Sequence, residues 1–152
     1  MANDVSRAEL TPKLIDSLYV EAMVLADEAR AYFDSTGRED RLGLDPVVRV
    51  GFSCESLKVT TRLMHVIAWL LTQRAVTAGE LSVARGRSPE RRVGDAPPSD
   101  DQLLPRLPEA ALILIRSSQD LYQRVRRLEE SDGAEPQPSP ARSLLSRLQR
   151  SL

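Results

Sequence analysis

The chain has 152 residues, of which 41% are hydrophobic and only 4% aromatic, so we expect one domain with an aliphatic core. Its 21 basic and 22 acidic side chains nearly cancel, which argues against a general nucleic-acid binder. A single cysteine excludes an internal disulfide, and no segment has the roughly 18 to 20 apolar residues that a membrane span needs. The polar N-terminal segment also lacks the apolar run of a secretory signal, so we expect a cytoplasmic protein.

The first predicted helix begins near Thr11 and Pro12 and ends at Gly37. Threonine is a good N-cap, proline suits the first helical position, and glycine is a common C-cap. Apolar residues recur at steps of three and four between positions 14 and 32, which indicates one buried face. Three apolar side chains lie outside that stripe, so the helix is expected to contact more than one neighbour: Val20, Met23 and Val24.

The second predicted helix begins at Asp45 and Pro46, stops at Gly79, and forms one unbroken rod from Val47 to Ala78. At about 1.5 Å per residue it would be about 50 Å long. It carries two apolar rows on nearly opposite sides, so different neighbours must cover them. The first row contains Val47, Val50, Cys54, Leu57, Thr61, Met64, Ala68, Leu71 and Ala75. The second row contains Val59, Leu63, Val66 and Leu70.

Two segments rich in proline, glycine and charge flank the third predicted helix, which begins at Pro108 and Glu109. The first, residues 80–106, is predicted to be a mobile surface loop, and the second opens a flexible C-terminal tail at residues 132–152. Within the tail, apolar residues recur at helical spacing: Leu144, Leu145, Leu148 and Leu152. No alternating strand pattern is present. We therefore predict an all-α protein, an antiparallel three-helix bundle over residues 1–131 followed by the tail.

No catalytic or metal-binding constellation is found in the sequence, so we expect neither an enzyme nor a cofactor. Cys54 and His65 would lie about 16 Å apart along the helix axis, far beyond the reach of a nucleophile and its base. One cysteine and one histidine are too few for a zinc site. We expect Cys54 to be a small buried apolar residue.

A mixed face lies between the two apolar rows of the central helix: Gly51, Glu55, Lys58, Arg62, His65, Trp69 and Gln73. One interpretation is a solvated face on which Trp69 folds back over the core and Glu55 pairs with Lys58. The other is a partner-binding surface, because Trp and Arg are frequent anchors at protein interfaces. The hypothesis for partner binding comprises Lys58, Arg62, His65, Trp69 and Gln73 together with the tail leucines Leu144, Leu145 and Leu148.

The wide separation of the two apolar rows also predicts apolar surface that one bundle cannot cover. A symmetric homodimer would cover such a surface. We assign its interface to apolar residues of the first helix that lie off the main stripe: Val20, Met23 and Val24.

Three segments resemble the RcdA family, regulators of CtrA degradation: "LIDSLYVEAMVLADEARAYFD", "FSCESLKVTTRLMHVIAWLLTQRAV" with the following "AGEL", and "SSQDLYQRV". The likeness spans Thr11 to Leu128 and is densest in the long central segment. It implies a dimeric three-helix bundle with a flexible tail, acting as a non-catalytic adaptor of the ClpXP protease. Such adaptors bind the protease after another adaptor has primed it and tether cargo such as cell-cycle transcription factors. A cyclic di-GMP-sensing adaptor can dock on them, and they can accompany the protease to a cell pole.

Two other classes of protein remain as alternatives. A helical DNA-binding or transcription-associated regulator would need a short turn between recognition helices and a basic face, which the long central helix and balanced charge disfavour. A small helical enzyme of the di-iron type would need Glu-x-x-His pairs, and the sequence contains none.

Overall fold

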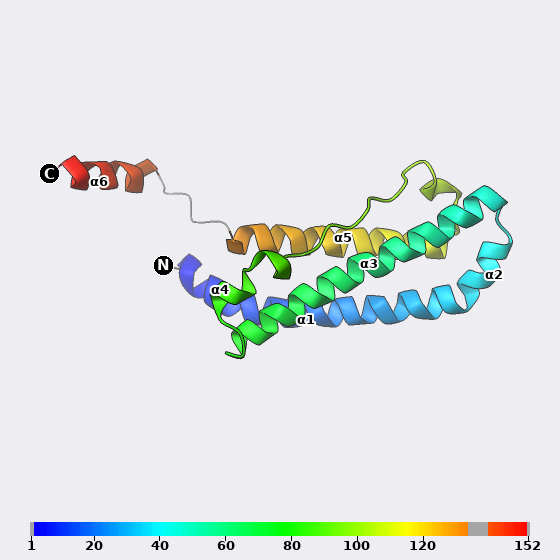
Figure 1. The fold of residues 1–152 in the computed structure, drawn as a ribbon, viewed down its shortest axis with the longest axis horizontal. Coiled ribbons are helices and arrows are strands. Elements are labelled where there is room, and N and C mark those ends of the chain that lie inside the picture. The colour runs from blue at the N-terminus through cyan, green and yellow to red at the C-terminus, as the bar shows by residue number, and fades with distance from the viewer. Residues whose placement is uncertain (1, 134–139, 152) are drawn as a thin grey trace.

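The computed structural model describes residues 2–133 and 140–151, and all regular structure in those ranges is helical. Three long helices pack against one another (Figure 1). In chain order the helices are α1 (Ala2–Asp34), α2 (Thr36–Leu42), α3 (Pro46–Thr77), α4 (Val83–Gly86), α5 (Glu109–Gly133) and α6 (Pro140–Ser151). Two short 3-10 turns, η1 (Pro89–Arg91) and η2 (Leu104–Arg106), lie between α4 and α5. The predicted all-α bundle is confirmed.

The helix α3 is a single continuous rod, as the sequence predicts. Pro46 occupies its first turn after the N-cap Asp45, where the missing N–H of proline is no loss. Beyond its end, Gly79 has a φ of +76°, a left-handed conformation that glycine adopts most readily. The predicted boundaries of α3 are therefore confirmed.

The first helix differs from its prediction at both ends. It begins at Ala2 and includes Pro12, so the Thr11 and Pro12 start signal is not used. The preceding residues include Ala, Glu, Leu and Arg, which favour helix, and a proline removes only one backbone donor. At the other end Gly37 is not a C-cap but a buried residue of α2, where an added Cβ would lie 2.7 Å from the carbonyl oxygen of Tyr32.

The directions of the long helices also depart from simple alternation. Glu21 of α1 pairs with Arg124 of α5, while Arg62 of α3 contacts Ser118, near the middle of α5. Farther along both helices, Trp69 of α3 and Glu129 of α5 line the same pocket. Therefore α3 and α5 run parallel and α1 runs antiparallel to both, because the connection between α3 and α5 returns along the bundle (Figure 1).

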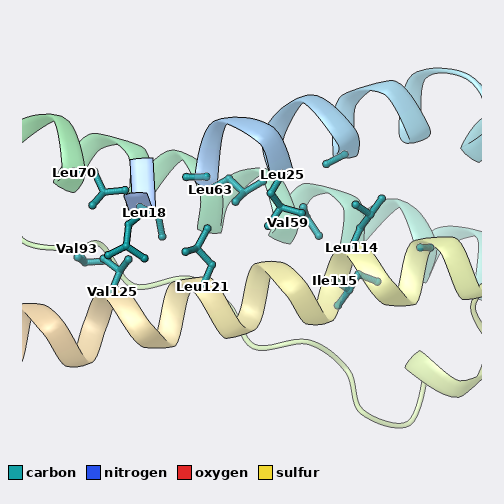
Figure 2. Packing of buried hydrophobic residues seen from close by; sticks show 14 of the residues in the cluster. Leu18, Leu25, Val59, Leu63, Leu70, Val93, Leu114, Ile115, Leu121 and Val125 are labelled. Carbon is teal, nitrogen blue, oxygen red and sulfur yellow. The ribbon is translucent and has the colours of Figure 1, made fainter. Parts of the chain in front are cut away.

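The core is aliphatic, as the composition predicts. The second apolar row of α3 is buried throughout, so we call it the inner row. It faces Leu18 and Leu25 of α1 and Leu121 and Val125 of α5 (Figure 2). Full burial of one such side chain contributes about 1.5 to 3 kcal/mol. The loop residue Val93 joins this core at 6% exposure, which fixes one end of the connection between α3 and α5.

Candidate partner-binding surfaces

The predicted mixed face of α3 is covered by the chain itself. Residues 93–104, which we call the strap, run along α3 and α5 without strand or α-helix. Under the strap Glu55 is 1% and Arg62 2% exposed. Trp69, 4% exposed, lies beyond the strap beside Arg92 and Glu129, and it packs in the core as the first interpretation expects. Lys58, His65 and Gln73 are only partly buried. The interpretation of this face as solvated is therefore wrong, since the connection that was expected to be a loose loop packs on it.

Arg62 is the centre of the covered face. Its guanidinium donates to Ser118 Oγ of α5 at 3.2 Å, and on the strap to Ser99 Oγ at 2.7 Å and the Pro97 carbonyl oxygen at 3.4 Å. Burial lowers the pKa of Arg62 from its ordinary value, and the charge of Glu55 opposes that shift. Arginine stays protonated even so, and it ties three segments of the chain together.

Glu55 and Lys58 form the predicted ion pair, with Lys58 Nζ 2.9 Å from Glu55 Oε2. Neither carboxylate oxygen has a well-aligned hydrogen bond among the described residues. A buried carboxylate whose pairing is incomplete is costly, because the charge has lost its water without full compensation. This site is therefore a polar interface inside the bundle and adds little to its stability.

The strap approaches α3 closely at two glycines. The His65 imidazole lies where a Cβ of Gly94 would be, and Leu103 of the strap lies where a Cβ of Gly51 would be. Any larger residue at either position would force its neighbour to move. Both glycines thus allow the strap to lie flat on the helix.

Polar residues of α5 hold the strap from the other side, and sequence reasoning missed them. The Tyr122 hydroxyl donates to the Gly94 carbonyl oxygen at 2.6 Å and accepts from the Ala96 amide at 3.1 Å. Glu129 Oε2 accepts from the Val93 amide at 2.8 Å. The one available signal was Ser118, a fully buried polar residue within the apolar stripe of this helix.

Arginines at the exposed end of α5 have partners within the chain. Arg126 pairs with Asp95 of the strap at 2.7 Å, and this hydrogen bond raises the pKa of Arg126. Arg124 binds Glu21 and Asp120, and its hydrogen bond with Glu21 is the largest cause that raises its pKa. Both are surface pairs, which contribute little to stability.

A small pocket of about 130 Å³ lies at the end of the covered face. Its lining residues are Trp69, Gln73, Gly86, Arg87, Arg92, Glu129 and Asp132. Within residues 2–133 and 140–151, no cluster of three or more His, Cys, Asp or Glu side chains could hold a metal ion.

The first apolar row of α3, from Val47 to Ala75, faces solvent, so neither α1 nor α5 covers it. Its large members are exposed by 79% at Val47, 62% at Val50, 67% at Leu57, 66% at Met64 and 47% at Leu71. Cys54 belongs to this row and is exposed as well, so the expectation of a buried cysteine is wrong. We call this row the outer seam.

The remaining predicted residues are also accessible. On α1 the three apolar residues off the main stripe are exposed, Val20 by 60%, Met23 by 38% and Val24 by 52%. On α6 the tail leucines Leu144, Leu145 and Leu148 are 56 to 61% exposed, and Leu152 lies outside the described residues. None of the helices in the described part is both long enough and apolar enough to cross a membrane.

Comparisons with known proteins identify the family. A family described as "Protein of unknown function (DUF1465)" matches residues 6–152. The crystal structure of RcdA from Caulobacter crescentus CB15 is 35% identical in sequence, with a TM-score of 0.67, over 81% of this chain and 93% of that one. No curated protein matches. The match to the whole bundle, and not to isolated motifs, shows that the chain belongs to the RcdA family.

Proposed function

We propose that this chain is a non-catalytic adaptor that tethers cargo, such as cell-cycle transcription factors, to the primed ClpXP protease. Membership of the RcdA family is the observation that carries the proposal. A tether acts by raising the effective concentration of a weak substrate at the protease, and its linker length sets the gain. The adaptor needs no cofactor and acts in the cytoplasm, with the protease at a cell pole, to time cell-cycle progression.

Its partners would be the protease with a priming adaptor, cargo proteins, and a cyclic di-GMP-sensing adaptor. The tail leucines Leu144, Leu145 and Leu148 suit a partner groove, since they form one apolar face on a short helix. On the bundle, Lys58, His65 and Gln73 keep some exposure at the strap edges. Arg62 is buried under the strap, so a partner reaches it only after the strap moves. Trp69 is buried beyond the end of the strap.

The outer seam suits a homodimer better than the α1 residues Val20, Met23 and Val24 do. Its exposed apolar positions alternate by three and four residues over about 40 Å, the spacing of a coiled-coil seam. Large residues recur every seventh position at 50, 57, 64 and 71, and small ones at 54, 61 and 68. Two antiparallel copies of α3 would place large residues against small ones, as close packing requires.

That pairing specifies a register. When Val50 of one copy faces the partner's Ala68, Cys54 faces the partner's Met64 and Leu57 faces the partner's Thr61. A symmetry axis close to the middle of α3 relates these pairs. The helices α1 and α5 then lie on the outer sides of the dimer, with the strap free of the interface.

A reconstituted degradation assay tests the adaptor function. It would contain purified protease, priming adaptor and a candidate cargo, with cargo loss measured with and without this chain. We expect at least tenfold faster cargo loss with the native chain, and loss of that gain when Leu144, Leu145 and Leu148 are replaced by Asp. An Ile113→Asp variant is the control, since Ile113 is an equally exposed apolar residue of α5 outside the proposed surfaces. An equal rate of cargo loss with and without the native chain would refute the function.

A further inference from the structure

We propose that the strap is a built-in occupant of a peptide-binding groove between α3 and α5, and that an extended, acidic, proline-containing segment of a partner displaces it. The inference rests on the proposed function in one respect, because the groove contains Arg62, which the adaptor would use for docking. The occupant is inferred from the chain segment that already fills the groove.

The strap lies in the groove as a bound peptide would. Residues 93–100 have no regular secondary structure, and Pro97 and Pro98 favour the extended polyproline conformation. The Tyr122 hydroxyl bonds to backbone atoms of Gly94 and Ala96, so these contacts do not depend on the side chains of the bound segment. Grooves that bind proline-rich segments commonly combine aromatic side chains with backbone contacts of this kind.

Apolar anchors hold only the two ends of the strap. Val93 is 6% and Leu104 5% exposed, whereas residues 94–102 contain no large apolar residue. The middle is held by polar contacts with Arg62, Tyr122 and Arg126. Water can replace such contacts at small net cost, so the middle can leave the groove while both ends stay in place.

The floor of the groove is charged, which a permanently closed core would avoid. Glu55, Arg62 and Ser118 are each 2% exposed or less, and Glu55 lacks a well-aligned hydrogen bond. Apolar residues of similar volume would fill this space at least as stably. Charged groups at this position are explained if the floor also binds a segment supplied by another protein.

The charges indicate the chemistry of the partner. Residues 94–102 contain Asp95, Asp100 and Asp101 and no basic residue. The groove offers three cations, Lys58, Arg62 and Arg126, against two carboxylates, Glu55 and Glu129. A partner segment with acidic residues around a proline pair would complement these cations, whereas a basic segment would be repelled.

Direct peptide binding tests the groove without any protease. In the full chain, residues 95–101 are replaced by Gly and Ser at equal length, and the probe is a fluorescein-labelled peptide with the sequence VGDAPPSDDQL of residues 93–103. The replaced variant should bind the peptide at least tenfold more tightly than the native chain, because the native strap competes at high effective concentration. Gln102→Ser, an exposed change that keeps all three strap acids in place, should bind as weakly as the native chain.

Three outcomes decide the proposal. A peptide with Lys in place of its three Asp residues, VGKAPPSKKQL, should bind the replaced variant at least tenfold more weakly, and equal binding overturns the charge match. Equal binding of VGDAPPSDDQL to the native and replaced chains overturns the competition. Hydrogen exchange is measured on the unmodified chain, so this third test holds even if the replaced variant fails to fold. The Ala96 amide should exchange at least tenfold faster than the amide of Val66 in the core of α3, and equal rates overturn local opening of the strap.

These results are separable from those of the degradation assay. Peptide binding with no effect on cargo loss would refute the adaptor function and leave the groove standing. Faster cargo loss without peptide binding would refute the groove and support the adaptor function.

Discussion

Arg62 of α3 donates a hydrogen bond to Ser118 Oγ of α5 at 3.2 Å, although the two residues are 56 positions apart in the chain. Both side chains are buried, and the same guanidinium also holds the strap. The bond therefore joins the central helix, the last helix of the bundle and their connection at one point.

Replacing Arg62 by Ala should lower the free energy of unfolding by about 2 to 4 kcal/mol, because it removes three hydrogen bonds and a positive charge that interacts favourably with buried Glu55. Arg62→Lys should cost less, since a positive charge remains near Glu55. Urea unfolding followed by circular dichroism measures both. Arg116→Ala, at an exposed arginine of α5, is the control, and an equal shift in the two Ala variants would contradict the anchoring role of Arg62.

Met64→Cys should form an intermolecular disulfide with the native Cys54 of a second copy under mild oxidation. The two positions face each other in the proposed antiparallel pairing of the outer seam, and both are exposed on one copy. Non-reducing gels measure the cross-linked dimer. Met23→Cys tests the interface first assigned to α1. Cross-linking through that residue alone would show that the dimer interface lies on α1 and not on α3.

Gly94→Ala should loosen the strap and lower stability by about 1 to 3 kcal/mol, because its Cβ would overlap the His65 ring. Gly94 does not have a positive φ, so the effect comes from packing and not from backbone strain. Limited trypsin digestion at Arg91 and Arg92 should become faster. Gly43→Ala is the matched control, as its Cβ would make only an ordinary 3.6 Å contact. His65→Ala should rescue Gly94→Ala, and a failure to rescue would assign the defect to another contact.

Stability should fall as pH rises above about 10, the usual pKa of tyrosine in an unfolded chain. Burial, together with the 2.7 Å hydrogen bond from the Tyr32 hydroxyl to Asp40, raises the pKa of Tyr32 in the folded state. The folded phenol then keeps its proton while the unfolded one loses it, so its stabilisation is complete below that pH and is lost above it. Urea unfolding from about pH 9 to about pH 11 should show a flatter decline in Tyr32→Phe than in the native chain.

Removing residues 134–152 should leave the bundle intact, because every buried core residue among those whose burial the structure describes lies between Ile15 and Val125. Circular dichroism should show an unchanged thermal midpoint, while delivery in the degradation assay is lost with the tail leucines. A marked fall in the midpoint would instead mean that the tail stabilises the bundle.

The sequence predicted those parts of the fold that depend on local chemistry. Asp45, Pro46 and Gly79 identified the ends of the central helix correctly, and three-and-four spacing identified its buried inner row. Packing between segments that are distant in the sequence was not predictable in this way. Periodicity cannot tell which of two apolar rows a bundle buries, so Cys54 was expected inside although the outer seam is exposed.

The sequence identified residues of the candidate site, but it did not predict their burial under the strap. Arg62 was singled out by type, yet its burial depends on a strap whose composition resembles that of a disordered loop. Its order comes from contacts with α5, such as those of Tyr122, which lies 26 residues from Ala96. No local pattern encodes a contact over that separation.

The parallel course of α3 and α5 has a consequence for geometry. Because the strap carries the chain back before α5 begins, α3 and α5 finish at the same end of the bundle. Two copies paired antiparallel along α3 would therefore place the C-terminal ends of their α5 helices at opposite ends of the dimer. Each end could then hold one bound molecule without obstructing the other.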